Sequence, residues 1–152
     1  MVLVTYALGS CIALTMYDPI ARIGGLLHFM LPDSSLDSAR STDNPCMFAD
    51  TGIALLLEKI CAQGASKSRL VVCAIGAAQI LNGQGLFDIG KRNYLAARRL
   101  LWKHRLLLQS EAIGGANSRN VSLEIGTGRL VVEEAGCAQE LLPAWPRKGE
   151  PV

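Results

Sequence analysis

The stretch MVLVTYALGSCIALTMYDPIARIGGLLHFML, residues 1–31, decides the fold class of this chain. It contains three apolar runs separated by a Gly-Ser and an Asp-Pro turn signal. The runs are Val2–Leu8, Cys11–Tyr17 and Arg22–Leu31. Continuous apolar runs of this length are typical of strands buried on both faces. We therefore predict three buried strands, the first two joined by a turn, with a bulge or a close backbone approach at Gly24-Gly25.

Beyond these runs, a polar segment over residues 32–44 predicts a long loop, and periodic apolar residues then predict two helices among further strands. The predicted elements are a helix from Asn44-Pro45 to Gly64, a strand over Arg69–Ile75, a helix over Ile89–His104 capped by Asp88, and strands over Leu106–Ile113, Val121–Ile125 and Arg129–Glu134. A second loop carries Asn82, Gly83 and Gly85, and Gly126-Thr127-Gly128 predicts a hairpin turn.

The predicted order is βββ-α-β-α-βββ, which is not the regular alternation of a doubly wound sheet. It favours an α+β fold: a single-domain layered sandwich with mixed β-sheet and two main helices. We expect the domain to cover residues 1–141. The proline-rich residues 142–152 are expected to form a loosely ordered tail.

Composition excludes several classes of protein. Half of the 152 residues are hydrophobic and 18% are charged, which excludes a disordered chain. The net charge of +2 gives no strong field for nucleic acid or for an anionic membrane. The first 17 residues are uncharged but lack a basic leader, and the run is too short and interrupted to span a bilayer. We therefore expect a soluble, cytoplasmic protein that is not inserted in a membrane.

The cysteines predict no structural metal site. They number five, without a C-x-x-C pair, and the chain has only two histidines, His28 and His104. An odd, scattered set is typical of reduced thiols in the cytosol, and we expect most of them to be small buried hydrophobes.

Cys11 is the candidate nucleophile because it follows a Gly-Ser turn after a buried strand, where a side chain can be exposed beside free backbone N–H groups. A thiol needs a base to act efficiently near neutral pH. If the second and third runs pair across a turn centred near residue 20, Cys11 and His28 become cross-strand neighbours. Thr5 could orient the imidazole. Spacing alone nevertheless favours an ordinary core thiol, a hydrogen-bonded core histidine and a strand threonine.

The second helix is basic, and Arg98, Arg99, Lys103 and Arg105 are candidates for docking an acidic partner. A solvated helix face explains the same residues. Few aromatic residues are interleaved with them, so nucleic acid is not the predicted partner. His104 is explained by its place at the end of the helix.

A specific resemblance carries the prediction further. L-G-S-C at residues 8–11 and H-F-M-L-P at residues 28–32, with Thr5 upstream, resemble the CheD family of chemoreceptor glutamine deamidases. The resemblance continues through Tyr17-Asp18, Gly24-Gly25, Ala49-Asp50, Gly90-Lys91-Arg92-Asn93 and Gly114-Gly115, and covers about residues 3–132. The chain departs from the family at Gly76-Ala77-Ala78, where the family tends to have Gly-Gly-Ala.

The resemblance implies a cysteine hydrolase that converts chemoreceptor glutamines to glutamates, with the fold of cytotoxic necrotizing factor-like deamidating toxins. It places the catalytic trio on Cys11, His28 and Thr5. Backbone N–H groups around Ser10 and Cys11 are then the expected oxyanion donors. No metal or organic cofactor is required. The implied substrate is the cytoplasmic helices of chemoreceptors, and some members of the family also bind a phosphatase of the CheC type.

Two alternatives stay open at this point. The chain could be a non-catalytic regulatory partner of a chemotaxis phosphatase, although Cys11, His28 and Thr5 are all present. It could also be a cysteine amidase that acts on another protein or on a small amide, which sequence cannot distinguish.

Overall fold

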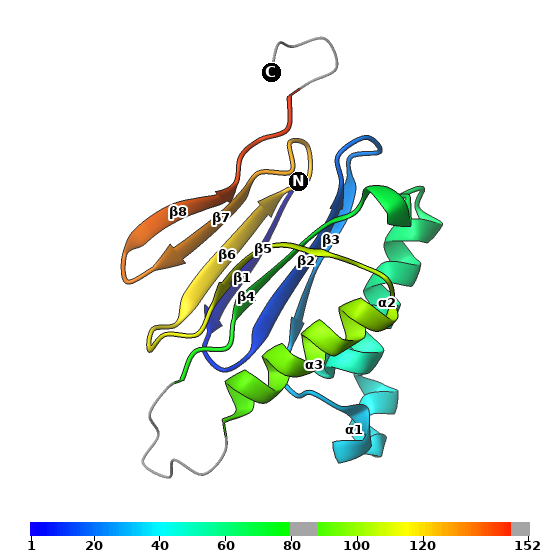
Figure 1. Cartoon of the computed structure of the whole chain (residues 1–152), viewed down its shortest axis with the longest axis vertical. Helices are drawn as coiled ribbons and strands as arrows, with labels where there is room; N and C mark the ends of the chain where they lie inside the picture. Colours follow the sequence, from blue (N-terminus) through cyan, green and yellow to red (C-terminus); the bar gives the residue numbers. More distant parts are fainter. Residues whose placement is uncertain (80–87, 147–152) are drawn as a thin grey trace.

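The computed structural model describes residues 1–79 and 88–146. This part of the chain forms three layers: helices, then a four-stranded sheet, then a second four-stranded sheet (Figure 1). The predicted α+β class, with a mixed sheet and two main helices, is confirmed. The likeness to the toxin fold and the division of the chain at residue 141 stay predictions. Residues 147–152 of the predicted tail and the predicted loop with Asn82, Gly83 and Gly85 lie outside the described residues.

The sheet next to the helices, called the inner sheet here, has the order β3-β2-β4-β5. Its strands are β2 (Ile12–Asp18), β3 (Ile23–Phe29), β4 (Val71–Gly76) and β5 (Leu108–Ile113). β2 is antiparallel to both neighbours, whereas β4 and β5 are parallel. Parallel neighbours require a crossover connection, and the helix Ile89–Lys103 lies between these two strands in the chain.

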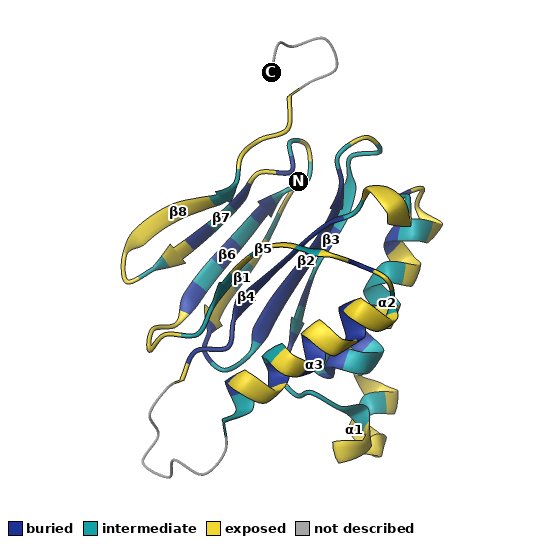
Figure 2. Ribbon diagram, viewed as in Figure 1, coloured by how far each residue is buried: buried dark blue, intermediate teal, exposed yellow. Residues whose placement is uncertain are grey.

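The other sheet, called the outer sheet here, is antiparallel with the order β1-β6-β7-β8. Its strands are β1 (Val2–Leu8), β6 (Arg119–Glu124), β7 (Leu130–Glu134) and β8 (Cys137–Leu142). The two strands predicted around Gly9-Ser10 are present as β1 and β2, but they belong to different sheets. β1 is also not buried on both faces, since its alternate residues face solvent (Figure 2). β8 was not predicted.

The helices of the described chain are α1 (Ser38–Asp43), α2 (Ala49–Ala62) and α3 (Ile89–Lys103). Short 3₁₀ turns cover Ser34–Leu36, Pro45–Met47 and Lys67–Arg69. The loop predicted over residues 32–44 thus contains α1, and the helix predicted from Asn44-Pro45 begins at Ala49. The Asp88 carboxylate accepts from Lys91 N at 3.0 Å, which confirms the predicted cap of α3. Within the described ranges, no helix is long and apolar enough to cross a membrane.

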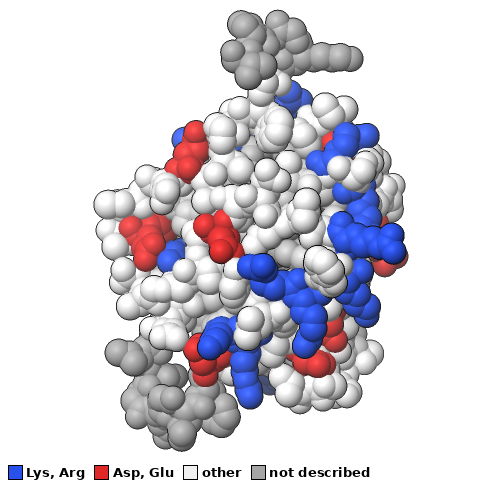
Figure 3. Space-filling view, in the orientation of Figure 1, with Lys and Arg blue, Asp and Glu red and all other residues white. Residues whose placement is uncertain are grey.

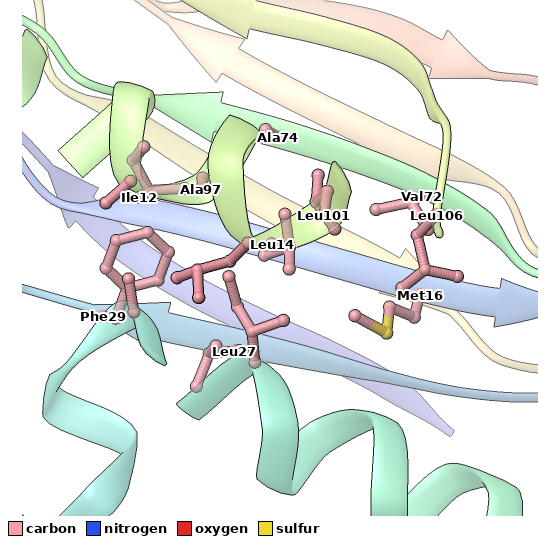
Figure 4. Close-up of a cluster of buried hydrophobic side chains, with 14 of the residues drawn as sticks. Ile12, Leu14, Met16, Leu27, Phe29, Val72, Ala74, Ala97, Leu101 and Leu106 are labelled. Atoms are coloured by element: carbon pink, nitrogen blue, oxygen red, sulfur yellow. The ribbon is translucent and has the colours of Figure 1, made fainter. Parts of the chain in front are cut away.

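β2 is the centre of both cores and is buried along its whole length (Figure 2). Successive strand residues point to opposite faces. Ile12, Leu14 and Met16 therefore pack against the helices in the first cluster (Figure 4). Ala13 packs between the two sheets in the second cluster. The continuous apolar run of β2 is explained by these two packed faces.

Gly24-Gly25 marks a close approach, as predicted, and not a bulge. The β2–β3 register is continuous through both glycines. A Cβ at Gly25 would lie 2.5 Å from Leu56 Cδ1 of α2. The helix therefore packs directly on the β3 backbone.

Asp18 ties the end of β2 to the segment before β4. Its carboxylate is fully buried and accepts from Ile20 N, Ala21 N and Ser66 N at 2.8–3.1 Å. Arg69 Nη2 donates to it at 2.7 Å. The Arg69 guanidinium, with the backbone donors, holds the pKa of Asp18 well below its usual range.

We expect Asp18→Asn to lower the free energy of unfolding by about 3 kcal/mol at pH 7, because an amide cannot satisfy these donors. The depressed pKa means that this contribution is complete above the unfolded-state pKa of 3.8 and is lost as the pH falls below it. Urea unfolding at pH 7 and in acid measures both effects. Asp43→Asn, at an exposed position, should change stability by less than about 0.5 kcal/mol. Equal loss in the two variants would contradict the prediction.

Candidate active site

The three predicted catalytic residues lie on elements that meet at one edge of the sandwich. β1 is an edge strand of the outer sheet, β3 is an edge strand of the inner sheet, and the two are in contact. The chain crosses from one sheet to the other between Leu8 and Ile12, and Cys11 lies in this crossing. The β1–β6 register shifts between Thr5 and Leu8, where Asn120 Oδ1 accepts from Ala7 N.

Thr5 and His28 are brought together although they belong to different sheets. Thr5 Oγ1 and His28 Nδ1 are hydrogen-bonded at 2.8 Å. Thr5 pairs with Val121 in the outer sheet, and His28 pairs with Ala13 in the inner sheet. The hydrogen bond therefore joins the two sheets and fixes the orientation of the imidazole.

Cys11 lies diagonally across from His28. His28 pairs with Ala13, so Cys11 is displaced two positions along β2 from the partner of His28. The predicted turn centre near residue 20 is confirmed, because β2 and β3 pair Asp18 with Ile23, but the register sets His28 opposite Ala13 and not opposite Cys11. Diagonal neighbours are roughly 7–8 Å apart at Cα, within reach of a long side chain. Cys11, like Ala13, packs toward the cluster between the sheets.

His28 presents one nitrogen that the sheet–sheet hydrogen bond does not use. Nε2 is buried and, in residues 1–79 and 88–146, it has no hydrogen-bond partner. Burial lowers the pKa of His28 below 6.5. The imidazole is therefore neutral at pH 7 and can accept a proton.

Burial raises the pKa of the Cys11 thiol above 9.0, opposed by the residue's own backbone N–H. At neutral pH the thiol is therefore protonated, and the imidazole is uncharged. A thiolate would form only with proton transfer to a base such as His28. The other cysteines do not follow the expectation of buried hydrophobes: Cys73 is buried, Cys61 is half-buried, and Cys46 and Cys137 are exposed.

The Gly76-Ala77-Ala78 segment supports the backbone around Cys11. Ala77 N donates to Cys11 O, and Ala78 N donates to Gly9 O, both at 2.9 Å. Gly76 has φ +123°, and a Cβ there would overlap the Cys11 carbonyl oxygen. Gly76-Ala77-Ala78 is the segment in which the chain departs from the family pattern. It therefore lies directly against the turn that holds Cys11.

We expect Gly76→Ala to lower the free energy of unfolding by at least about 2 kcal/mol and to displace Cys11, because both the backbone angle and the added methyl are unfavourable. Urea unfolding measures the loss. Gly126→Ala is the matched control, since a Cβ there meets nothing within 4 Å. A loss at Gly76 no larger than at Gly126 would refute the expectation.

The predicted docking residues lie apart from the trio, on α3 and just after it. Arg98 and Arg99 line a groove of about 670 Å³ between α3 and β5, which also includes the largely exposed Trp102 and Leu107. Lys103 and Arg105 are exposed nearby. Figure 3 shows that basic side chains gather over the helix layer. Arg98 Nη1 donates to Tyr94 OH, which donates to Glu111 Oε2 at 2.6 Å, so the groove is not purely basic.

Asn93 is a polar residue at the site to which the sequence analysis assigned no role, although it belongs to the block Gly90-Lys91-Arg92-Asn93. It is fully buried on α3, and its Nδ2 lies within hydrogen-bond distance of Ser10 O and Met30 O. The available signal was an amide on the apolar stripe that also carries Ala97 and Leu100. In the described chain, no group of three or more His, Cys, Asp or Glu side chains could hold a metal ion.

Known proteins are similar to this chain over most of its length. The family described as CheD chemotactic sensory transduction matches residues 30–134. A probable chemoreceptor glutamine deamidase CheD of Solibacter usitatus is 59% identical, over 97% of this chain and 88% of that protein. A probable chemoreceptor glutamine deamidase CheD 1 of Syntrophus aciditrophicus is 48% identical, over 89% and 84%. A chemoreceptor glutamine deamidase CheD of Thermotoga maritima is 38% identical, over 92% and 86%.

Proposed function

The chain belongs to the CheD family, and we propose that it hydrolyses glutamine side chains of chemoreceptors to glutamate and ammonia. The observation that carries the proposal is the hydrogen bond between Thr5 and His28, which orients an imidazole beside the turn that holds Cys11. The names of the relatives support the amide-hydrolase reaction and the substrate. The proposed site of action is the cytoplasm, where receptor modification regions lie.

In the first step, the Cys11 sulfur attacks the carboxamide carbon while His28 Nε2 accepts the thiol proton. For Nε2 to accept, Nδ1 must carry the other proton and donate to Thr5 Oγ1, which lies at 2.8 Å. The tetrahedral intermediate carries its charge on the former carbonyl oxygen. Collapse of this intermediate breaks the C–N bond, and the proton on His28 leaves with ammonia.

In the second step, water hydrolyses the thioester. The water oxygen adds to the acyl carbon as His28 accepts one of its protons. The C–S bond then breaks as His28 returns that proton to the sulfur, which gives glutamate and the free thiol. The net reaction is addition of one water and loss of one ammonia. The Cys11 N–H is the proposed donor to the oxyanion in both steps.

Mass spectrometry of a receptor cytoplasmic fragment tests the function. Incubation with the protein should raise the fragment mass by about one unit for each glutamine converted, with one ammonia released. Cys11→Ala should give no change. An unchanged fragment with intact protein would contradict deamidation of receptors. It would then favour a cysteine amidase with another substrate, or a regulatory partner of a CheC-type phosphatase.

We further propose that Arg98, Arg99, Lys103 and Arg105 help dock the receptor. Modification regions rich in Glu and Gln are complementary to these cations, and the exposed Trp102 supplies apolar contact beside them. α3 rises about 1.5 Å per residue, so Arg98 and Lys103 lie roughly 8–15 Å along the helix from Asn93 at the site.

Arg98→Glu with Arg99→Glu should lower kcat/KM on the receptor about tenfold at low ionic strength, and should weaken its salt dependence, because steering acts on association. Hydrolysis of a small activated ester should not change. Lys59→Glu with Lys67→Glu makes the same change of charge at exposed positions outside the groove. If both double variants have the same kcat/KM at all salt concentrations, the docking proposal is contradicted, and these basic residues only form a solvated helix face.

A further inference from the structure

We propose that Asn93 is a positioning residue that aims the Cys11 N–H at the oxyanion. The inference rests on the proposed acyl-transfer chemistry. It concerns the geometry of the site and does not depend on which amide is the substrate.

The contacts of Asn93 place it between the two segments that carry the nucleophile and the base. Asn93 Nδ2 donates to Ser10 O at 3.0 Å and to Met30 O at 2.9 Å. Ser10 immediately precedes Cys11, and Met30 follows His28 by two residues. One NH₂ group thus bridges two carbonyls that belong to different parts of the chain. A buried Asn is suited to this role because its NH₂ carries two protons.

The helix that carries Asn93 is itself fixed against the site. A Cβ at Gly90, in the first turn of α3, would lie 2.9 Å from backbone atoms of Ala77. Ala77 N in turn donates to Cys11 O at 2.9 Å. The Ser10–Cys11 segment is therefore held from both sides, by Asn93 at the Ser10 carbonyl and by Ala77 at the Cys11 carbonyl.

The hydrogen bond at Ser10 O determines where the Cys11 N–H points. Ser10 O and Cys11 N belong to one trans peptide, so the N–H points opposite to the carbonyl. Because the carbonyl points to α3, the N–H points away from the helix layer and toward the space between the sheets. The Cys11 side chain packs on that side too. A hydrogen bond to the carbonyl also polarises the N–H of the same peptide.

Stability alone does not account for this amide. Asn93 Oδ1 is buried and has no hydrogen-bond partner in the part of the chain that the structure describes. A buried acceptor without a partner is unfavourable for folding and offsets part of what the two Nδ2 hydrogen bonds contribute. Both Nδ2 protons donate to carbonyls next to the site, one in the Cys11 segment and one in the His28 segment.

Two reactions of Cys11 separate positioning of the oxyanion donor from a purely structural role. Acylation by p-nitrophenyl acetate passes through an oxyanion, whereas alkylation by iodoacetamide is a direct displacement at carbon without one. We expect Asn93→Ala to slow acylation of Cys11 about 10- to 100-fold with little change in KM, since an oxyanion donor is worth up to about 10³-fold. Alkylation of Cys11, followed by peptide mass spectrometry, should stay within about threefold of wild type.

Asn93→Asp adds a pH-dependent readout. It also keeps the proposal testable if the alanine variant does not fold. An ionised carboxylate cannot donate to either carbonyl, whereas the protonated acid donates one hydrogen bond. The acylation rate of this variant, divided by that of wild type at the same pH, should therefore rise as the pH falls. The ratio for Asn93→Ala should stay flat. Asn120→Ala, which removes the contact to Ala7 N in β1, is the matched control and should change neither reaction by more than about threefold.

The proposal is overturned if acylation in both Asn93 variants stays within threefold of wild type, or if acylation and alkylation fall together. It is also overturned if Asn120→Ala reproduces the loss. A wild-type protein that is acylated at Cys11 but leaves the receptor fragment unchanged would overturn the proposed function only.

Discussion

Cys11→Ala is expected to lower the rate of glutamine hydrolysis at least about 10⁴-fold, the largest effect of any single substitution in this chain. The reason is that no thioester can form without the sulfur. The other thiol of the cluster between the sheets, Cys73 on β4, is fully buried, and its pKa is raised to about 11 by burial. Ammonia release and the receptor mass measure the loss. Because Cys11 is only half-buried, thermal unfolding should change little.

Cys46→Ser with Cys137→Ser is the matched control for the nucleophile. Both thiols are exposed and lie outside the trio, so this double variant should keep full activity. It also removes the most accessible sites of alkylation, which would otherwise compete with Cys11. A Cys11→Ala variant that retains more than about 1% of the wild-type rate would contradict the mechanism.

His28→Ala should lower turnover by about 10²–10⁴-fold without unfolding the chain, because the variant loses the group that accepts the thiol proton and delivers a proton to ammonia. The effect depends on the thiol being protonated at neutral pH, as its raised pKa requires. Steady-state kinetics with the receptor fragment measure it. A near wild-type rate would contradict the role of His28 as the base and would indicate that it is a core residue only.

The pH dependence and Thr5 provide independent checks on the base. His28 acts only when neutral, and burial lowers its pKa, so the acid limb of kcat/KM should lie below pH 6.5. Thr5→Val should cost less than His28→Ala, about tenfold, because Thr5 orients the imidazole and transfers no proton. An acid limb above pH 6.5 would contradict a neutral, buried imidazole.

The sequence predicted the family and most elements because these depend on local pattern. The L-G-S-C and H-F-M-L-P blocks indicated the CheD family, and the comparisons confirm it. The unbroken apolar run of β2 indicated a strand packed on both faces, and periodic residues after the Asp88 cap indicated α3. The catalytic roles of Cys11, His28 and Thr5 stay predictions.

Other features could not be read from pattern because they depend on what each segment packs against. β8 is largely exposed and pairs along an edge, so its sequence lacks the apolar alternation that marks a half-buried strand. α1 carries no buried residue and is polar except for Ala39, so its sequence has the pattern of a loop. Apolar β1 and β2 look alike in sequence, yet only β2 has layers on both sides.

The site likewise combines features that the local sequence determines with features that depend on packing. The sequence by itself determined which chemical groups are present: a thiol after a Gly-Ser turn, an imidazole at the end of a strand and a hydroxyl upstream. Only the tertiary structure decided that β1 leaves β2 to pair with β6, which brings Thr5 across the sheets to His28. It also set the β2–β3 register that places Cys11 diagonally from His28, and the helix packing that brings Asn93 to Ser10. Strand partners and registers are fixed by long-range burial, since a shift by one residue exchanges the faces of a strand.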